Sequence, residues 1–330
     1  MARTVLLFSG GWTDLPLETL AQLAADWGYQ GLDLACWGDH FEVQRALAED
    51  DYCTEKLALL ARLELSVPVV SAHRVGQAVL DRIENRHRGI LPDYVWGDGT
   101  PEGVRQRAAE EMLATLRAAQ RLGASVVAGF CGSPIWGAIL GYPAASPALV
   151  DDALREFQRA WGPILEQCRE CGLRFALEVH PGQLAYDYYS TEGVLEAMQG
   201  HDDFGLVFDP SHLHWQGIDP VAFIRRFAER IFHVHIKDIA VRLDGRTGLF
   251  GSSLGYGDPR RGWDFRSPGR GDLDWEAILR ALNEVGYDGP LAIEWSDAGM
   301  NREAGAEEAC AFIKRLDFEP PRRAERSAFR

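Results

Sequence analysis

Four side chains with metal-binding chemistry stand at the ends of four successive apolar runs in the second half of the chain. They are Glu178 after RFAL, Asp209 after FGLVF, His235 at the end of IFHVH, and Glu294 after PLAI. A single acid at a strand end often caps the next helix, but four potential metal ligands, each at the end of a strand, favour a shared site. Three carboxylates and an imidazole suit Mn²⁺, Mg²⁺ or Co²⁺ better than a thiolate-loving ion. We predict that these residues bind one divalent metal ion.

Side chains able to move protons stand beside the predicted ligands. His180 follows the first ligand by two residues and Lys237 follows the histidine ligand by two, so on a strand each faces the same side as that ligand. His73 follows the run SVPVVSA. We expect the catalytic base among these three and the metal-bound Glu178 and Glu294. Each histidine also fits a structural role, and Lys237 could instead pair with a carboxylate.

Aromatic and basic residues near the same strand ends are candidates for substrate contacts. Trp12, Trp37 and Trp136 follow apolar runs or lie in the loops after them, and aromatic rings stack on sugar faces. Packing in the core is the alternative for each of them. Arg270 belongs to a connection rich in glycine and arginine, residues 237–273, which could close over a substrate.

The elements that must position these residues repeat one unit: an amphipathic helix, a glycine and an apolar strand. For example, Pro101 follows Thr100 at a helix start, apolar residues recur at helical spacing, and Gly123 ends the helix. The predicted strands are TVLLFS, GLDLAC, SVPVVS, SVVAGF, LRFALE, FGLVFD, IFHVHI and PLAIEW. Eight strands alternating with helices predict an α/β fold, the (β/α)₈ TIM barrel, whose chemistry lies at the carboxyl ends of the strands.

The chain length fits one such barrel with insertions. We predict a single catalytic domain over residues 1–316 and a tail over 317–330 that is flexible or contacts another subunit. Long connections over residues 73–100, 132–147 and 237–273 all follow strand ends on the predicted catalytic face. Loops of this length usually serve as lids or binding elements.

Composition narrows the class of protein. The 330 residues carry a net charge of −15, which would repel a phosphate backbone, so we expect no nucleic-acid partner. No apolar stretch is long enough to span a bilayer, and the N-terminal apolar run is too short for a signal peptide. The six cysteines are scattered, as is usual for reduced thiols. We expect a cytoplasmic protein without a membrane partner.

The motifs LEVHP, FGLVFDPSHL, FHVHIKD, GRGDLDW and LAIEW together resemble the xylose isomerase-like TIM-barrel superfamily. This group of sugar phosphate isomerases and epimerases includes ketose 3-epimerases, inosose dehydratases and endonuclease IV. The resemblance implies one metal on the four predicted ligands and a substrate contact from His212. The DNA-binding surface of endonuclease IV does not suit so acidic a chain.

Longer motifs give a narrower resemblance. ACWGDHF, RHRGILPDYVWGDG, GVRQRAAEEM, DPSHLHWQG and GDPRRGWDF look like the large subunit of bacterial C-glycoside deglycosidases, which act on 3-keto-glycosides. This resemblance implies a small second subunit, and we expect an oligomer.

The predicted site suits the enolisation of a keto-sugar. A divalent ion, with Mn²⁺ favoured, would polarise the carbonyl so that a base can remove the neighbouring proton. The specific prediction is β-elimination on a 3-keto-glycoside. The alternatives are a ketose 3-epimerase or sugar phosphate isomerase with the same site, an inosose dehydratase, and a non-catalytic subunit that binds sugar.

Overall fold

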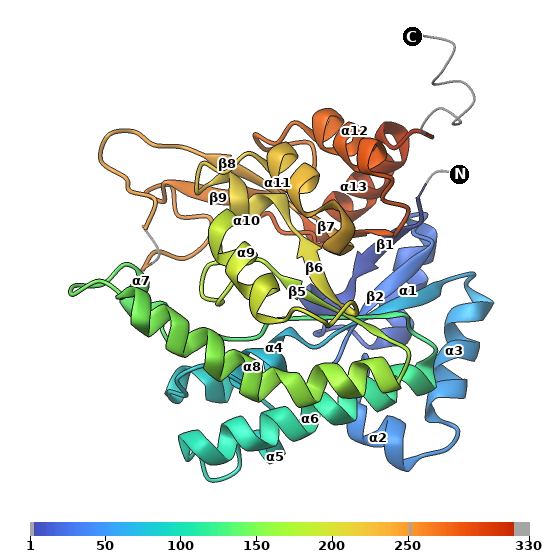
Figure 1. The fold of residues 1–330 in the computed structure, drawn as a ribbon. Coiled ribbons are helices and arrows are strands. Elements are labelled where there is room, and N and C mark those ends of the chain that lie inside the picture. The colour runs from blue at the N-terminus through green and yellow to red at the C-terminus, as the bar shows by residue number, and fades with distance from the viewer. Residues whose placement is uncertain (1–2, 251–252, 320–330) are drawn as a thin grey trace, which may run out of the picture.

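Eight parallel strands close a barrel in the computed structural model, which describes residues 3–250 and 253–319 (Figure 1). All eight apolar runs of the sequence form its strands: β1 (Val5–Phe8), β2 (Gly31–Ala35), β3 (Ser66–Ser71), β4 (Val126–Gly129), β5 (Arg174–Glu178), β6 (Phe204–Phe208), β7 (Ile231–Ile236) and β10 (Leu291–Ile293). Their order around the barrel is β1-β10-β7-β6-β5-β4-β3-β2. The predicted TIM barrel is confirmed.

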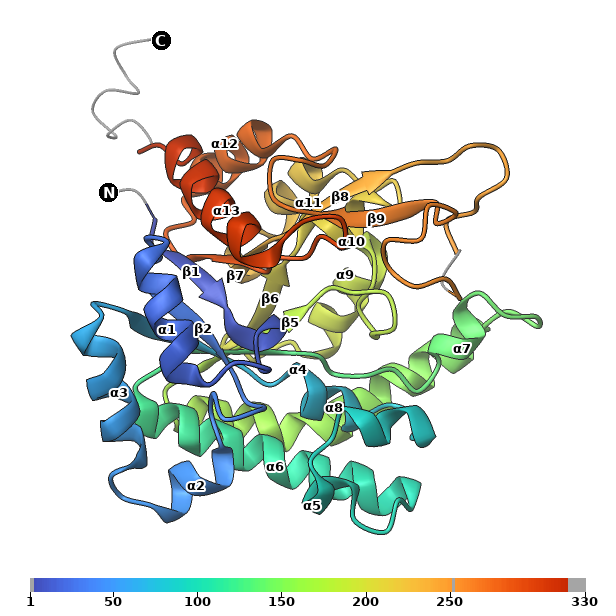
Figure 2. The same ribbon diagram turned by 180° about the vertical axis from the view of Figure 1, so that it is seen from behind.

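Helices surround the barrel on its outer side (Figures 1 and 2). They are α1 (Leu17–Asp26), α2 (Val43–Ala48), α3 (Tyr52–Arg62), α6 (Pro101–Leu122), α8 (Pro147–Glu170), α9 (Tyr188–Ala197), α10 (Pro210–His214), α11 (Pro220–Phe227), α12 (Trp275–Val285) and α13 (Arg302–Leu316). Single-turn 3₁₀ helices are η1 (Ser9–Gly11) and η3 (Ala228–Arg230). Helix α6 begins after Thr100 with Pro101 in its first turn, as the sequence predicts. It ends at Gly123, whose φ of 82° is a left-handed conformation that favours glycine.

Side chains along each strand point alternately into the barrel and out toward the helices. Ala176, Val207 and Ala292 belong to a small apolar cluster inside the barrel. Their neighbours Leu177 and Phe208 belong to the large core between barrel and helices. Because side chains alternate, the residue two positions after each inner residue also points inward. In β5, β6 and β10 that residue is one of the predicted metal ligands, placed at the carboxyl end of the barrel.

The three long connections carry extra elements at this end of the barrel (Figure 1). The first forms α4 (His73–Ala78), η2 (Asn85–Gly89) and α5 (Asp93–Trp96), and the second forms α7 (Trp136–Ile139). The third forms an antiparallel pair, β8 (Asp238–Val241) and β9 (Trp263–Arg266), which the sequence analysis did not predict. Asp238 is buried at its base and accepts hydrogen bonds from Gly269 N (2.8 Å) and Trp275 Nε1 (2.9 Å).

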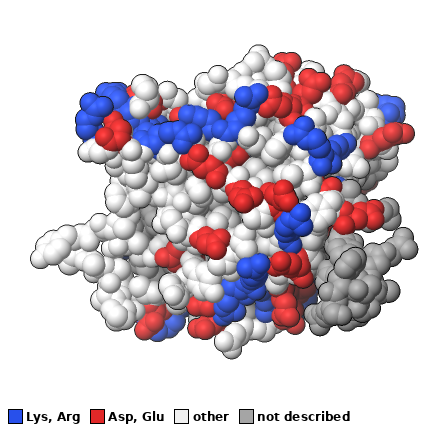
Figure 3. Space-filling model, turned by 90° about the horizontal axis from the view of Figure 1, so that it is seen from above, with Lys and Arg blue, Asp and Glu red and all other residues white. Residues whose placement is uncertain are grey.

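The start of the predicted tail is fixed to the barrel. Asp317 is buried, accepts a hydrogen bond from the Arg3 backbone nitrogen (2.8 Å) and forms an ion pair with the Arg3 guanidinium. The rest of the predicted tail, residues 320–330, lies outside the described residues. Within the described part, no helix has both the length and the hydropathy of a membrane span. The face seen in Figure 3 intersperses basic and acidic side chains.

Candidate metal centre

The four predicted ligands meet at the carboxyl end of the barrel. One ligand atom each from Glu178, Asp209, His235 and Glu294 lies within 4.8 Å of the others. Glu178 is the last residue of β5, Asp209 directly follows β6, His235 lies in β7 and Glu294 directly follows β10. The first three are buried, whereas the Glu294 side chain is 21% exposed. The site is therefore shielded from solvent on the side of the barrel interior and open on the side of the barrel mouth.

The unpaired atoms at this site fit a divalent cation. Oδ1 of Asp209 accepts a hydrogen bond from Ser211 N (2.8 Å), but its Oδ2 is buried without a hydrogen-bond partner. Nδ1 of His235 is also buried without one. Three carboxylates this close together repel one another unless positive charge lies between them. The hard, oxygen-rich donor set and the close approach of its ligand atoms together make this a candidate divalent-metal site.

Asp33 in β2 orients the histidine ligand, and the sequence analysis missed it. Its Oδ2 lies 3.1 Å from His235 Nε2 and 2.9 Å from His233 Nε2, and Ser71 Oγ donates to its Oδ1 (2.6 Å). Burial raises the pKa of Asp33, but the hydrogen bonds to both histidines outweigh burial and depress it. The ionised carboxylate thus holds the proton of His235 on Nε2 and turns Nδ1 toward the other ligands.

Lys237 supplies a positive charge beside the ligands. Its Nζ lies 2.5 Å from Glu294 Oε1 and 4.4 Å from the centre of the Phe265 ring. Burial lowers the pKa of Lys237, but the carboxylates around it outweigh burial and raise it. Burial raises the pKa of Glu294, yet Lys237 and His235 bring it down to about 2. Both groups are therefore charged at neutral pH.

His180 is a neutral imidazole next to His212. Its Nδ1 donates a hydrogen bond to Pro181 O (2.5 Å), so its Nε2 carries the free lone pair. Burial lowers the pKa of His180 to about 3, and the neighbouring His212 adds to this effect. The centres of these two rings are 4.0 Å apart. A neutral imidazole with a free Nε2 can accept a proton from a substrate.

His212 and His73 contact the ligands from two sides. Nε2 of His212 lies 3.2 Å from Asp209 Oδ2 and 3.3 Å from Glu178 Oε1. Burial lowers the pKa of His212, but the Asp209 and Glu178 carboxylates outweigh burial and raise it to about 9. His73, the first residue of α4, places Nε2 2.8 Å from Glu178 Oε2.

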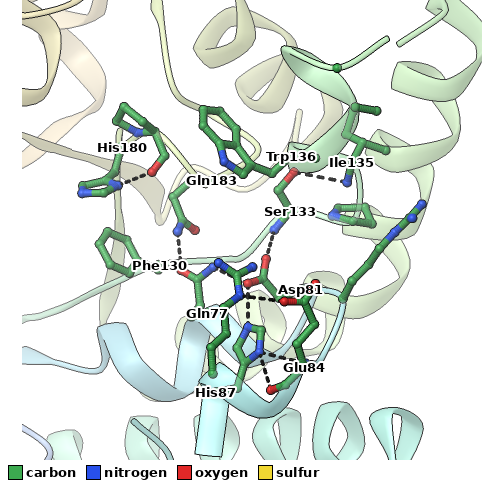
Figure 4. Close-up of a pocket in the computed structure, with 18 of the residues that line it drawn as sticks. Gln77, Asp81, Glu84, His87, Phe130, Ser133, Ile135, Trp136, His180 and Gln183 are labelled. Atoms are coloured by element: carbon green, nitrogen blue, oxygen red, sulfur yellow. Dashed lines mark hydrogen bonds and ion pairs between the residues drawn. The ribbon is translucent and has the colours of Figure 1, made fainter. Parts of the chain in front are cut away.

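Two cavities open around these residues. The first, of about 290 Å³, lies over the ligands. It is lined by Phe8, Gly11, His180, His212, Lys237, Tyr256, Phe265, Glu294, Trp295 and Ser296. The second, of about 1020 Å³, lies beside it and has His73 in its wall. Figure 4 shows His180 and Trp136 in the same wall.

Trp12, Trp37 and Arg270 are not brought to the ligands. Trp12 is 1% exposed and packs against Trp27, with ring centres 5.4 Å apart, so its place is in the core. Arg270 forms an ion pair with Glu308 of α13 (2.6 Å) at the surface. Trp37 lines a separate cavity of about 360 Å³. Position after a strand does not fix the direction of a side chain, and none of these three lines the cavity over the ligands.

Fold and site together define a TIM barrel with a candidate divalent-metal centre at its carboxyl end. A model of the family described as "Xylose isomerase-like TIM barrel" matches residues 21–316, and the chain belongs to this family. One sequence relative is the uncharacterized protein YfiH of Bacillus subtilis, which is 30% identical over 159 residues (47% of this chain, 50% of YfiH). Another is inosose dehydratase of Lacticaseibacillus casei, which is 28% identical over 148 residues (45% of this chain, 49% of the dehydratase). The matched stretch thus spans about half the length of these relatives. A solved structure of similar fold is 3-keto-D-glucoside 4-epimerase YcjR from E. coli, with a TM-score of 0.64, 13% identity, and coverage of 95% of this chain and 99% of that one.

Proposed function

We propose that this chain enolises a keto-sugar by removing the proton next to a carbonyl held at the metal centre, and that its specific reaction is β-elimination on a 3-keto-glycoside with Mn²⁺ as the metal. The observation that carries the proposal is the cavity over the four-ligand site, where His180, His212 and Lys237 line the same space as the ligand Glu294. The inosose dehydratase relative is named for an elimination on a keto-cyclitol, which supports this class of reaction.

The role of the four predicted ligands in this reaction is to hold the metal. Glu178, Asp209, His235 and Glu294 would hold the divalent ion, which when bound polarises the substrate carbonyl and stabilises the negative charge that develops on its oxygen.

Protons are handled by the chain's own side chains. Nε2 of His180 accepts the proton from C2 of the sugar, and the C–H electron pair forms the C1–C2 double bond while the bond from C1 to the aglycone breaks. The aglycone departs with the electron pair of the broken bond to C1 and takes up a proton from water. His212 and Lys237 both line the cavity and can donate hydrogen bonds to sugar oxygens.

The second candidate is a ketose 3-epimerase, and one observation favours it. Glu178 and Glu294 both lie at the site with pKa values held below the ordinary range, so each is ionised and able to accept a proton. One of them would remove a proton and the other would return it. The small second subunit and the oligomer implied by the sequence resemblance remain predictions.

Hydrogen exchange distinguishes the two reactions. The Mn²⁺-loaded protein is incubated in D₂O with a 3-keto-glucoside and, separately, with free ketohexoses, and the products are followed by NMR. The proposal expects deuterium at C2 of the 3-keto-glucoside and release of its aglycone. Exchange at C3 of a free ketose with accumulation of its epimer would instead establish the epimerase.

A further inference from the structure

A loop of the third long connection reaches the cavity over the metal ligands. The loop covers residues 253–262, directly before β9, and its Tyr256 lines that cavity. The backbone nitrogen of Gly257 donates a hydrogen bond to Asp264 Oδ2 (2.5 Å), which fixes the main chain beside the tyrosine. A Cβ atom at Gly257 would lie 2.9 Å from the Cβ atom of Ala298, so the loop also packs against the segment that follows β10. The loop therefore brings a tyrosine from outside the barrel to the candidate metal centre.

Contacts within the loop and with β9 hold the Tyr256 ring. The guanidinium of Arg261 lies 4.5 Å from the centre of the Tyr256 ring and 4.7 Å from that of Trp263. Arg261 is itself buried and donates hydrogen bonds to Leu254 O (2.6 Å) and Trp263 O (3.2 Å). The Tyr256 ring also packs against Phe265, with ring centres 5.2 Å apart. A ring that is already fixed loses little entropy when its hydroxyl meets a ligand.

The hydroxyl of this ring is free to contact a substrate. Within residues 3–250 and 253–319, the hydroxyls of Tyr256 and Ser296 line the cavity without a hydrogen-bond partner. A phenol is a far stronger acid than an aliphatic alcohol, and tyrosine is one of the side chains that serve as general acids. Of these two hydroxyls, that of Tyr256 is therefore the one suited to proton transfer.

Lys237 and His212 line the same cavity but lie on the metal ligands. Nζ of Lys237 is 2.5 Å from Glu294 Oε1. Nε2 of His212 is 3.2 Å from Asp209 Oδ2 and 3.3 Å from Glu178 Oε1. In the proposed reaction the ligands serve the carbonyl at C3, whereas the leaving oxygen is bonded to C1, two carbons away. These donors are thus placed for the carbonyl end of the sugar, and the leaving group needs a donor of its own.

Resting on the proposed function, we propose that Tyr256 is the general acid of the elimination. As the bond from C1 to the glycosidic oxygen breaks, its electron pair goes to that oxygen, which takes the proton of the Tyr256 hydroxyl. The aglycone therefore leaves as an alcohol and not as an alkoxide. The tyrosinate regains a proton from water, so water is still the net source of that proton. His180 releases the C2 proton to solvent, which restores both side chains.

The test varies the leaving group, because 4-nitrophenolate departs as a stable anion without a proton and methoxide does not. Methyl and 4-nitrophenyl 3-keto-β-glucosides are compared on wild-type protein and on Tyr256→Phe, with Mn²⁺ bound. We expect the variant to lower kcat/KM by about 10²–10⁴-fold for the methyl substrate and by less than about 3-fold for the 4-nitrophenyl substrate. Tyr189→Phe, which removes a hydroxyl from an exposed ring of α9, is the matched control and should change neither.

Deuterium exchange separates failure of this role from failure of the proposed function. When departure is slow, the enolate of the methyl substrate returns to the 3-keto-glucoside, so Tyr256→Phe in D₂O should still introduce deuterium at C2 while methanol release falls. An unchanged kcat/KM for the methyl substrate, or an equal loss for both substrates, overturns the role of Tyr256. A loss in Ser296→Ala in place of Tyr256→Phe assigns the step to the other free hydroxyl and also overturns it. A wild-type protein that neither exchanges C2 nor releases an aglycone overturns the proposed function itself.

Discussion

Replacing Asp33 by Asn should weaken metal binding without removing any ligand. The Asp33 carboxylate contacts His235 Nε2 at 3.1 Å and thereby fixes which nitrogen of that ligand faces the metal site. Asparagine has nearly the same shape but no charge, and its amide nitrogen cannot accept a hydrogen bond. A charged hydrogen bond contributes about 1.5–3 kcal/mol against about 1 kcal/mol for a neutral one. The difference, about 0.5–2 kcal/mol, corresponds to a roughly 2- to 30-fold loss of affinity. It overlaps the roughly 10- to 100-fold effect usual for partners of metal-bound histidines.

Calorimetric titration of the metal-free protein with Mn²⁺ measures this effect. The matched control is Asp81→Asn, which also removes the charge of a buried aspartate near a histidine (His87 Nε2, 2.9 Å) but lies in the wall of the larger cavity. We expect the Kd for Mn²⁺ to rise about 10- to 100-fold in Asp33→Asn and less than about 2-fold in the control. An unchanged Kd in Asp33→Asn, or an equal rise in both variants, would refute the proposed role of Asp33.

Three further predictions concern the ligands and the histidines. Glu294→Gln and His235→Ala should each lose metal retention and activity, and circular dichroism should show that the fold is intact. Full activity in either variant would contradict the ligand set. His180→Asn should keep the metal, measured by elemental analysis, but slow C2 deuterium exchange by about 10²–10⁴-fold, whereas an unchanged rate would assign the base to another residue. The His212 imidazolium competes with the metal for Asp209 and Glu178, and its pKa is raised to about 9 from an ordinary 6.5. Mn²⁺ affinity measured by titration should therefore increase from pH 6.5 to 9, and a constant or falling affinity would exclude this competition.

The sequence predicts the barrel and the four ligands because both depend on local patterns. Strands buried on both faces are continuous apolar runs, so their ends are visible in the sequence, and a charged residue at such an end must point toward water or a partner. Glu178, Asp209 and Glu294 stand at such ends, and the structure brings them together with His235.

Residues placed by long-range contacts were not predictable in the same way. Asp33 lies inside the apolar run GLDLA. A single acid in such a run indicates that its carboxylate is paired with another buried group, and the sequence gives no other sign of that pairing. The partners themselves, His233 and His235, are about 200 residues away in the sequence. Trp12 and Arg270 show the converse. Trp12 follows a strand and Arg270 lies in the arginine-rich connection, which suggested a site, but they contact Trp27 and Glu308 instead. Sequence position gives proximity to the barrel mouth but not the direction of a side chain.

The most direct test of the metal centre is a crystal structure of the Mn²⁺-loaded protein with anomalous diffraction recorded at the manganese edge. The predicted result is one strong peak between Glu178, Asp209, His235 and Glu294, bonded to Nδ1 of the histidine, with Nε2 of the same ring still on Asp33. A peak at the other cluster of possible ligands, formed by Asp33, His233 and His235, or no peak at either, would contradict the account.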